Sequence, residues 1–223
     1  MAALRDPQTF HRRPVASRIF ESMLQWFRRR AEANRRAQEL YGSVVTAARQ
    51  PFFYKDMGVP DTPEGRFELV SLHLFLALES LNQQRSAELD LTQRTIEAFV
   101  TDMDDCMREM GVGDLAVPKK VKRAAAAFYE RAGAYRRGLS APEKPDLEGS
   151  LETYVFSANP GNGAGVAALA AYIRKAASKL SAKPFDERVA GGGLVELLVV
   201  DRGHVAEDHL LSGRIGEGLH LSA

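Results

Sequence analysis

The sequence predicts an all-α protein: a single compact helical domain of about six helices, with a flexible arginine-rich N-terminal arm and a partly extended C-terminal tail. Three observations lead to this prediction. Apolar residues recur with the period of an amphipathic helix in several stretches. Threonine, proline and glycine stand at the ends of these stretches, where helices start and stop. The chain is 45% hydrophobic and 26% charged, which is typical of folded domains rather than of disordered proteins.

We expect the 223 residues to divide into three segments. An arginine-rich arm with an amphipathic helix occupies 1–33, a helical domain 34–186, and a glycine-rich tail 187–223. The single cysteine, Cys106, excludes an internal disulfide and a cysteine-rich zinc site. The longest apolar run, Leu194–Val200, is too short to cross a bilayer, and the N-terminus has no secretory signal pattern. We therefore expect a cytoplasmic protein, with peripheral contact to the inner face of the cytoplasmic membrane as one option.

The formal net charge is only +1, but the charges are grouped along the chain. Residues 1–40 hold nine arginines and four acidic residues, and residues 41–115 hold thirteen acidic and six basic residues. Residues 116–140 hold seven basic residues and a single acidic one, Glu130. Such blocks mark either surfaces that meet charged partners or solvated helix faces, and the sequence leaves both interpretations open.

A short basic amphipathic helix is predicted from Ser17. Its apolar stripe includes aromatic residues beside a run of arginines; the residues of interest are Trp26, Phe27, Arg28, Arg29 and Arg30. Such a helix either packs on the core or rests on an anionic surface, which can be a membrane or ribosomal RNA. These five residues are therefore candidates for docking to a membrane or to the ribosome.

Further helices follow from caps and breakers. A helix over 34–50 ends before Pro51, because proline disfavours a helical conformation in the residue before it. Thr62 followed by Pro63 predicts the start of the next helix, which extends to about residue 84 and is apolar on nearly every side, so it should be central. Three more helices are predicted. The first extends from Thr92 to Gly111, with Met103, Met107 and Met110 facing inward. The second covers 118–137 and ends at Gly138, and the third covers 165–180.

Charged side chains are concentrated at two of these helix ends. Asp61, Arg66 and Glu68 surround the start of the central helix. Acidic and basic residues also flank the loop that follows Gly111, and the candidates there are Asp102, Asp104, Asp105, Arg108, Glu109, Asp114, Lys119, Lys120 and Lys122. These charges either pair with each other and hold two helices together, or bind polar parts of a hydrophobic client protein.

No catalytic pattern organises the remaining polar residues. The loop Gly161–Gly165 opens a helix and could hold a phosphate, but it lacks both the G-x-G-x-x-G order and the Walker lysine. His204 and His209 are spaced five residues apart, which places them on different faces of a helix. His73 is expected to be a hydrogen-bonded core residue. We therefore expect no enzyme activity, cofactor, metal or small-molecule substrate.

Two blocks of sequence resemble the ubiquinol–cytochrome c chaperone family. The first is FYKDMGVPDTPEGRFELVSLHLFLALESLN at 53–82, and the second is DMDDCMREMGVGDLAVPKKVKRAAAAFYERAGAY at 102–135. With weaker similarity on either side, the resemblance extends over about residues 35–180 and is typical of a bacterial member. It implies a helical, non-enzymatic chaperone that binds newly made cytochrome b and escorts it into respiratory complex III.

Two other functions are consistent with the residues alone. Arg28–Arg36 and Lys119–Arg137 could form an RNA- or ribosome-binding module. The loop Gly161–Gly165 would be the site of a nucleotide-binding protein. RNA binding should weaken steeply with salt, and a nucleotide titration tests the second alternative.

Overall fold

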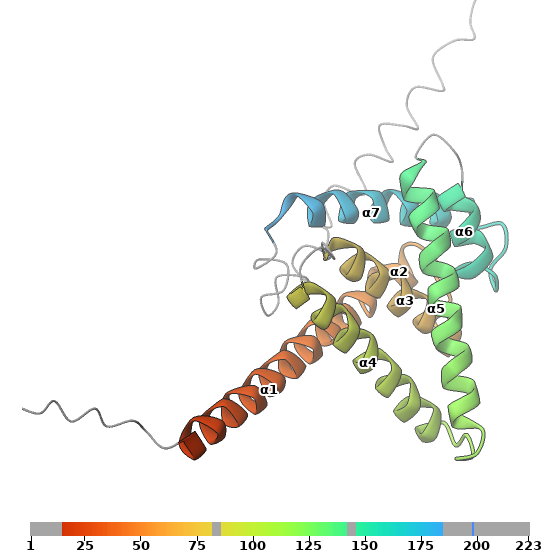
Figure 1. Cartoon of the computed structure of the whole chain (residues 1–223). Helices are drawn as coiled ribbons and strands as arrows, with labels where there is room; N and C mark the ends of the chain where they lie inside the picture. Colours follow the sequence, from red (N-terminus) through yellow and green to blue (C-terminus); the bar gives the residue numbers. More distant parts are fainter. Residues whose placement is uncertain (1–14, 82–85, 142–145, 185–197, 199–223) are drawn as a thin grey trace, which may run out of the picture.

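The computed structural model describes residues 15–81, 86–141, 146–184 and 198, except for a few side chains near the starts of two helices. This part of the chain folds into seven helices and contains no β-strand (Figure 1). The all-α prediction is confirmed. The predicted tail and the first fourteen residues of the predicted arm lie outside the described residues, apart from Leu198.

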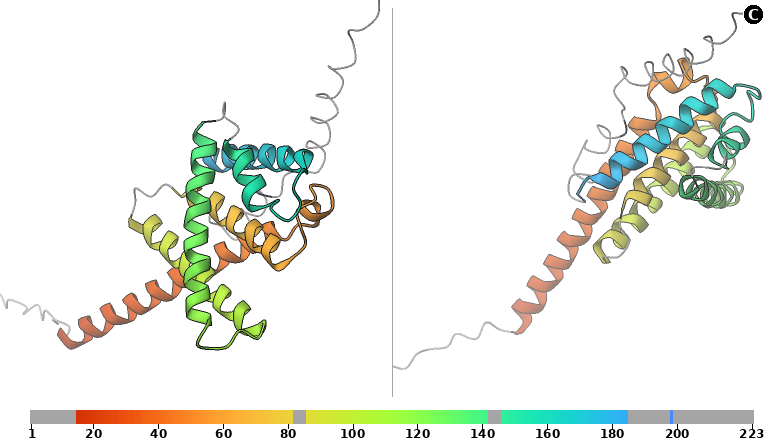
Figure 2. Two further views of the ribbon diagram at one scale, coloured as in Figure 1. Left: turned by 90° about the vertical axis from the view of Figure 1, so that its right-hand side faces the viewer. Right: turned by 90° about the horizontal axis from the view of Figure 1, so that it is seen from above.

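The first helix, α1 (Val15–Ala48), extends without a break across the predicted boundary between residues 33 and 34. Two separate helices were expected here, but residues 31–33 are Ala-Glu-Ala, which favour helix and contain no breaker. The C-terminal half of α1 is packed against the body, with Leu40 and Val44 buried. The N-terminal half projects from the body (Figures 1 and 2).

The central helix is α3 (Pro63–Ser80), and every residue from Glu68 to Leu78 is buried. As predicted, Thr62 caps it: the Gly65 amide donates to the Thr62 hydroxyl at 3.1 Å, with proline in the first turn. The segment before it contains a short helix, α2 (Pro51–Lys55), where a loop was predicted. The side chain of Phe53 is fully buried, so this segment belongs to the core.

Three helices surround α3 directly: α1, α5 (Val117–Ser140) and α7 (Gly163–Ala182). A further helix, α4 (Ser86–Glu109), packs on α1 and α5, and α6 (Asp146–Tyr154) packs on α5 and α7. Helices α4 and α5 form a hairpin whose turn reaches the same end of the molecule as the projecting start of α1 (Figures 1 and 2).

Two predicted helix ends are wrong. Helix α4 begins at Ser86 rather than at Thr92, so Thr92 lies inside it. Helix α5 continues through Gly138 to Ser140. Gly138 does not stop the helix but allows α6 to approach, because a Cβ atom there would lie 2.7 Å from the Leu147 Cα atom.

No helix within the described ranges is both long enough and apolar enough to cross a membrane. Aromatic side chains from different helices contact one another in the core. Phe99 of α4 lies near Tyr41 of α1 and Phe128 of α5, with ring centroids 6.2 and 5.5 Å apart. Phe53 of α2 is in edge contact with Tyr172 of α7 at 5.1 Å.

Candidate functional site

The turn between α4 and α5 fixes the position of most charged candidates. Gly111 has a φ of 79°, so it ends α4 in the left-handed conformation that the sequence predicts for it. The Val112 amide donates to the Met107 carbonyl at 3.0 Å, and the Ala116 amide donates to the Gly113 carbonyl at 2.8 Å. The next residue, Val117, is fully buried and anchors the start of α5. The charged ends of both helices are therefore held around one ordered turn.

The α4 side of this turn carries an acidic edge, which consists of Asp104, Asp105, Glu109 and Asp114. Arg108 connects two of them: its Nε atom lies 2.5 Å from Asp104 Oδ2, and its Nη1 atom lies 2.5 Å from Asp114 Oδ1. Asp105 and Glu109 are exposed and form no ion pair with any described residue. They leave two adjacent negative charges, one helical turn apart, open to a partner.

The α5 side carries a basic edge, which consists of Lys119, Lys120 and Lys122. All three side chains are exposed, and none forms an ion pair with a residue that the structure describes. The ion pairs that do form here stay within α4 and the turn. No ion pair within the described ranges joins the acidic edge to the basic edge.

Asp102 has a different environment from the acidic edge. The Tyr41 hydroxyl donates to Asp102 Oδ2 at 2.7 Å, which joins α1 to α4 in a half-buried position. Burial, followed by this contact with a carboxylate, raises the pKa of Tyr41 far above its usual range. The Asp102 carboxylate therefore has a contact within the fold.

The three candidates at the start of α3 also differ from one another. Arg66 and Asp61 form an exposed ion pair, with Nε and Oδ1 2.7 Å apart. Glu68 faces the interior, where Arg131 binds its carboxylate. Of these three residues, only Asp61 and Arg66 are open to a partner. Glu68 is close to them in sequence, but it lies on the buried side of α3.

Two apolar side chains at the turn are exposed, and the sequence did not predict either. The Leu115 side chain is 100% exposed, and Met110 is 62% exposed. Met110 was expected to face the core, but Gly111 ends α4 directly after it, at a point where the helix has passed the body. Both residues flank a short turn that contains Gly111 and Gly113 and lies between charged helix ends. This position in the sequence could have indicated that they are exposed.

The docking candidates on α1 are in the half that projects from the body. Every side chain described between residues 21 and 31 is exposed, including Trp26 at 54% and Phe27 at 57%. The two rings are in edge contact, with centroids 4.9 Å apart, and the Arg30 guanidinium lies 5.6 Å from the Trp26 ring centroid. Arg28, Arg29 and Arg30 form no ion pair with any described residue. Trp26, Arg29 and Arg30 also line a small pocket with Asp90 and Arg94 of α4, so the five docking candidates are exposed but lie partly beside that helix.

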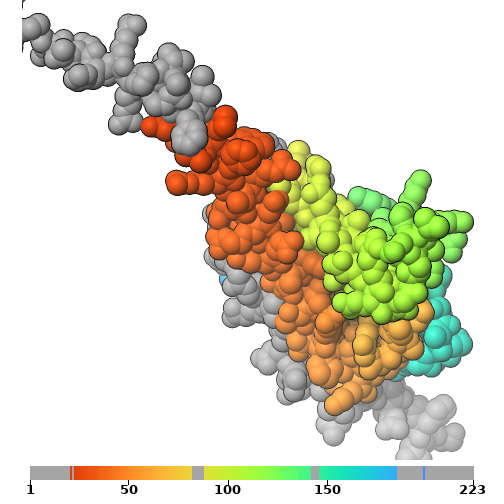
Figure 3. Space-filling model, turned by 90° about the horizontal axis from the view of Figure 1, so that it is seen from below, coloured from red at the N-terminus to blue at the C-terminus, as the bar shows by residue number. Residues whose placement is uncertain are grey.

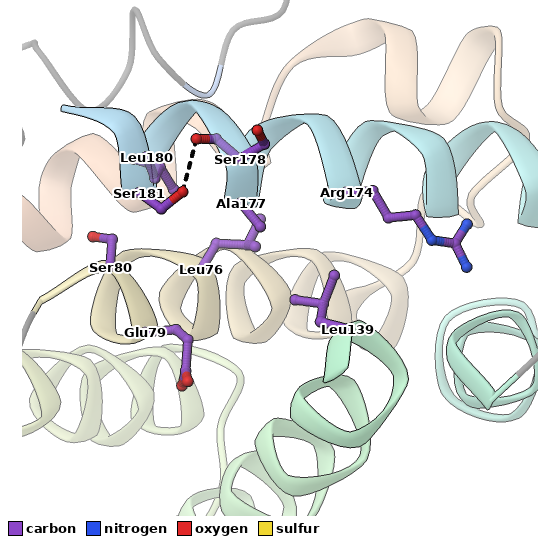
Figure 4. Close-up of a pocket in the computed structure, with 9 residues that line it drawn as sticks. All are labelled: Leu76, Glu79, Ser80, Leu139, Arg174, Ala177, Ser178, Leu180 and Ser181. Atoms are coloured by element: carbon purple, nitrogen blue, oxygen red, sulfur yellow. Dashed lines mark hydrogen bonds between the residues drawn. The ribbon is translucent and has the colours of Figure 1, made fainter. Parts of the chain in front are cut away.

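A groove of about 450 Å³ lies between α3, α5 and α7 (Figure 4). Leu76, Leu139 and Leu180 contribute apolar side chains to it, and Glu79 and Arg174 lie at its sides. Both of these charges are paired: Glu79 with Arg136 at 2.6 Å, and Arg174 with Glu148 at 2.8 Å. The sequence does not reveal this groove, because its lining comes from three helices far apart in the chain.

The loop Gly161–Gly165 is a capped helix start that packs on the chain before α3. Asn162 accepts a hydrogen bond from the Gly165 amide at 3.0 Å, and its own amide group donates to the Met57 carbonyl at 2.9 Å. A Cβ atom on Gly165 would lie 2.1 Å from the Met57 carbonyl oxygen, so this glycine is required for close packing. The described residues contain no cluster of three potential metal ligands, and His204 and His209 lie outside them.

Comparisons with known proteins agree with this arrangement. A family model described as ubiquinol–cytochrome c chaperone matches residues 55–194, which include α3, both edges of the α4–α5 turn and α7. The chain is also similar to the crystal structure of the Cbp3 homolog from Brucella abortus. The two share 36% sequence identity with a TM-score of 0.67, and the match covers 76% of this chain and 93% of the other.

A search of curated proteins found no match. The family model alone covers more than half of the chain, and the solved structure extends the similarity to the fold of 76% of the chain. The matched region contains all partner-binding candidates from Asp61 to Lys122, whereas the docking candidates on α1 precede the residues that the family model matches. The chain belongs to the ubiquinol–cytochrome c chaperone family.

Proposed function

We propose that this protein is a non-enzymatic chaperone for assembly of ubiquinol–cytochrome c reductase, and that its client is newly made cytochrome b. The observation that supports this most is the family match over 55–194. The similarity to the Brucella abortus Cbp3 homolog supports the same role. Exposed charges without ion pairs among the described residues around one ordered turn are suited to binding a charged protein partner.

We infer that the client contacts the acidic edge of the α4–α5 turn. Asp105 and Glu109 are exposed on the same side of α4 and have no ion pair within the described chain. An unpaired surface carboxylate is solvated in the free protein. It contributes most to binding when the partner places a basic group beside it and excludes water. Asp104 and Asp114 are already bound to Arg108, so they contribute less to a new contact.

Charge reversal at this edge tests the inference. Asp105→Lys combined with Glu109→Lys should strongly reduce co-purification of cytochrome b. Helical content should be unchanged, because neither side chain has a partner within the described fold. The matched control is Asp56→Lys with Glu152→Lys, which makes the same charge change at exposed, unpaired positions elsewhere. Equal client capture by the two double variants would contradict the proposed contact.

A deletion strain tests the function itself. Loss of the protein should lower the level of cytochrome b and of assembled ubiquinol–cytochrome c reductase, and the wild-type gene should restore both. Complementation by the Asp105→Lys/Glu109→Lys variant should fail, whereas the control variant should succeed. Normal assembly of the reductase without this protein would refute the proposal.

A second role is supported by the projecting half of α1. We propose that Arg28, Arg29 and Arg30, with Trp26 and Phe27, dock the protein on an anionic surface, at the inner face of the cytoplasmic membrane or on ribosomal RNA. A row of unpaired arginines attracts either surface, and both interactions weaken with salt. Replacing the three arginines by glutamine should release the protein from that surface while client capture by the purified chain persists.

A further inference from the structure

The projecting half of α1 and the α4–α5 turn lie at the same end of the molecule. Figure 1 shows both at its lower edge, and they are again lowest after a quarter turn about the vertical axis (Figure 2, left). The view from below shows both on the face toward the viewer, with α4 between the projecting half of α1 and the turn (Figure 3). A flat surface below the molecule would therefore meet both elements at once.

Both elements expose apolar side chains next to unpaired basic ones. On α1 the exposed apolar residues are Met23, Leu24, Trp26 and Phe27, each at least 41% exposed, and Arg28–Arg30 follow directly. At the turn, Leu115 and Met110 precede the basic edge formed by Lys119, Lys120 and Lys122. Exposing large apolar side chains to water is unfavourable unless a partner covers them.

The mixture of side chains distinguishes between possible partners. Aromatic rings can stack on RNA bases, but aliphatic side chains such as Leu24 and Leu115 gain little from RNA. Hydrocarbon accepts aliphatic and aromatic groups alike, and the negative headgroups of anionic lipids attract arginine and lysine. The combination at both elements thus favours a lipid surface.

We propose that α1 and the α4–α5 turn form one two-point docking face for an anionic lipid bilayer. Trp26 and Phe27 insert at one point and Leu115 at the other, while Arg28–Arg30 and the basic edge bind lipid headgroups. This inference rests on the docking role proposed above for α1 and names its surface. Two points of contact also fix the orientation of the molecule, so the acidic edge on α4 stays accessible beside the membrane.

The acidic edge limits how the turn can approach the lipid. Asp104 and Asp114 share Arg108, which neutralises part of their charge, but Asp105 and Glu109 are unpaired within the described chain. The face that meets the bilayer must therefore be the α5 side of the turn. Reversal of Lys119 and Lys120 should then affect lipid binding far more than reversal of Asp105 and Glu109.

Sedimentation with lipid vesicles tests the proposal on the full-length purified chain without client. The protein should pellet with equimolar phosphatidylcholine and phosphatidylglycerol and remain in solution with phosphatidylcholine alone. Lys119→Glu with Lys120→Glu should lower the vesicle partition coefficient by about tenfold or more. The reason is that each lysine near an anionic membrane surface adds to the electrostatic attraction, which a glutamate turns into repulsion. Lys175→Glu with Lys179→Glu is the matched control, because α7 lies on the opposite side of the molecule (Figure 1) and the partition should be retained.

Single apolar changes separate insertion from charge attraction. Trp26→Ser and Leu115→Ser should each lower the partition several-fold, and the double variant should lose more than either one. Circular dichroism and thermal unfolding should match the wild type, because both side chains are exposed. Wild-type partition of Leu115→Ser and Lys119→Glu/Lys120→Glu would overturn the two-point face, as would preferential binding to a ribosomal RNA fragment that displaces the vesicles. Normal cytochrome b capture by variants that lack vesicle binding would leave the client proposal intact.

Discussion

The carboxylate of Glu68 and the guanidinium of Arg131 form a two-point ion pair between α3 and α5. Arg131 Nε lies 2.5 Å from Glu68 Oε2, and Nη2 lies 2.6 Å from Oε1. The side chains are only 8% and 16% exposed, and the guanidinium also lies 4.6 Å from the Tyr154 ring centroid of α6. Burial raises the pKa of Glu68, and Arg131 opposes that shift. This pair therefore connects three helices through groups that are costly to separate.

Removing one partner should destabilise the fold strongly. Arg131→Met leaves the Glu68 carboxylate buried without its cation, and we expect a loss of about 3–5 kcal/mol in the free energy of unfolding. The double variant Glu68→Leu/Arg131→Met should recover most of this loss, because no buried charge is left unpaired. Urea unfolding followed by circular dichroism gives both values. Equal destabilisation by the single and double variants would show that packing of Arg131, rather than pairing, is what matters.

A second buried link joins α3 to α7 through His73 and Tyr172. His73 Nδ1 lies 2.7 Å from the Leu69 carbonyl oxygen, and Nε2 lies 2.8 Å from the Tyr172 hydroxyl oxygen. The same hydroxyl lies 2.9 Å from the Leu198 carbonyl oxygen. Tyr172→Phe leaves His73 Nε2 and the Leu198 carbonyl without this hydroxyl, and it should cost about 1–3 kcal/mol. Tyr135→Phe is the control, since the Tyr135 hydroxyl, equally buried, has no hydrogen-bond partner among the described residues and should cost less.

The burial of His73 predicts a pH dependence of stability. Burial lowers the pKa of His73 from its ordinary value of 6.5 to about 4. The unfolded chain therefore binds a proton more readily than the folded one, and stability should fall as the pH decreases from about 6.5 toward 4. The full effect corresponds to about 3 kcal/mol. The difference in unfolding free energy between pH 7 and pH 5, measured for the wild type and for His73→Gln, isolates this contribution; an identical decline in both would exclude His73 as its source.

The sequence was most informative where a local rule decides the structure. The Thr62 cap, the left-handed Gly111, the buried central helix and the core position of His73 were all predicted correctly. Each depends on neighbours within one or two turns, which capping and periodicity describe. One error arose where a distant contact decides the structure. Gly138 looks like a helix stop in sequence, but its role is set by Leu147 of α6.

The candidate site followed the same pattern. Charge grouping located the turn between α4 and α5, because the order of acidic and basic residues is visible in the sequence. Which charges are free was not visible: Glu68 is paired with Arg131, 63 residues away, and Asp102 with Tyr41, 61 residues away. Such pairs depend on how the helices pack. Helix packing also decides that the start of α1 and the α4–α5 turn lie at the same end of the molecule, which the sequence does not show.

Two glycines of α5 should respond in opposite ways to the same substitution. A Cβ atom at Gly138 would lie 2.7 Å from Leu147 Cα and 2.8 Å from its backbone nitrogen, so Gly138→Ala must move α6 away from α5. At Gly133 the nearest atom is the end of the flexible Arg137 side chain at 3.6 Å, which is ordinary contact. We expect Gly133→Ala to stabilise the protein by about 0.5–1 kcal/mol, because alanine favours helix more than glycine does. Gly138→Ala should instead destabilise it by about 1–3 kcal/mol through overpacking. Thermal unfolding of the two variants decides the point: a higher midpoint for both would mean that α6 can shift away from α5 at no cost.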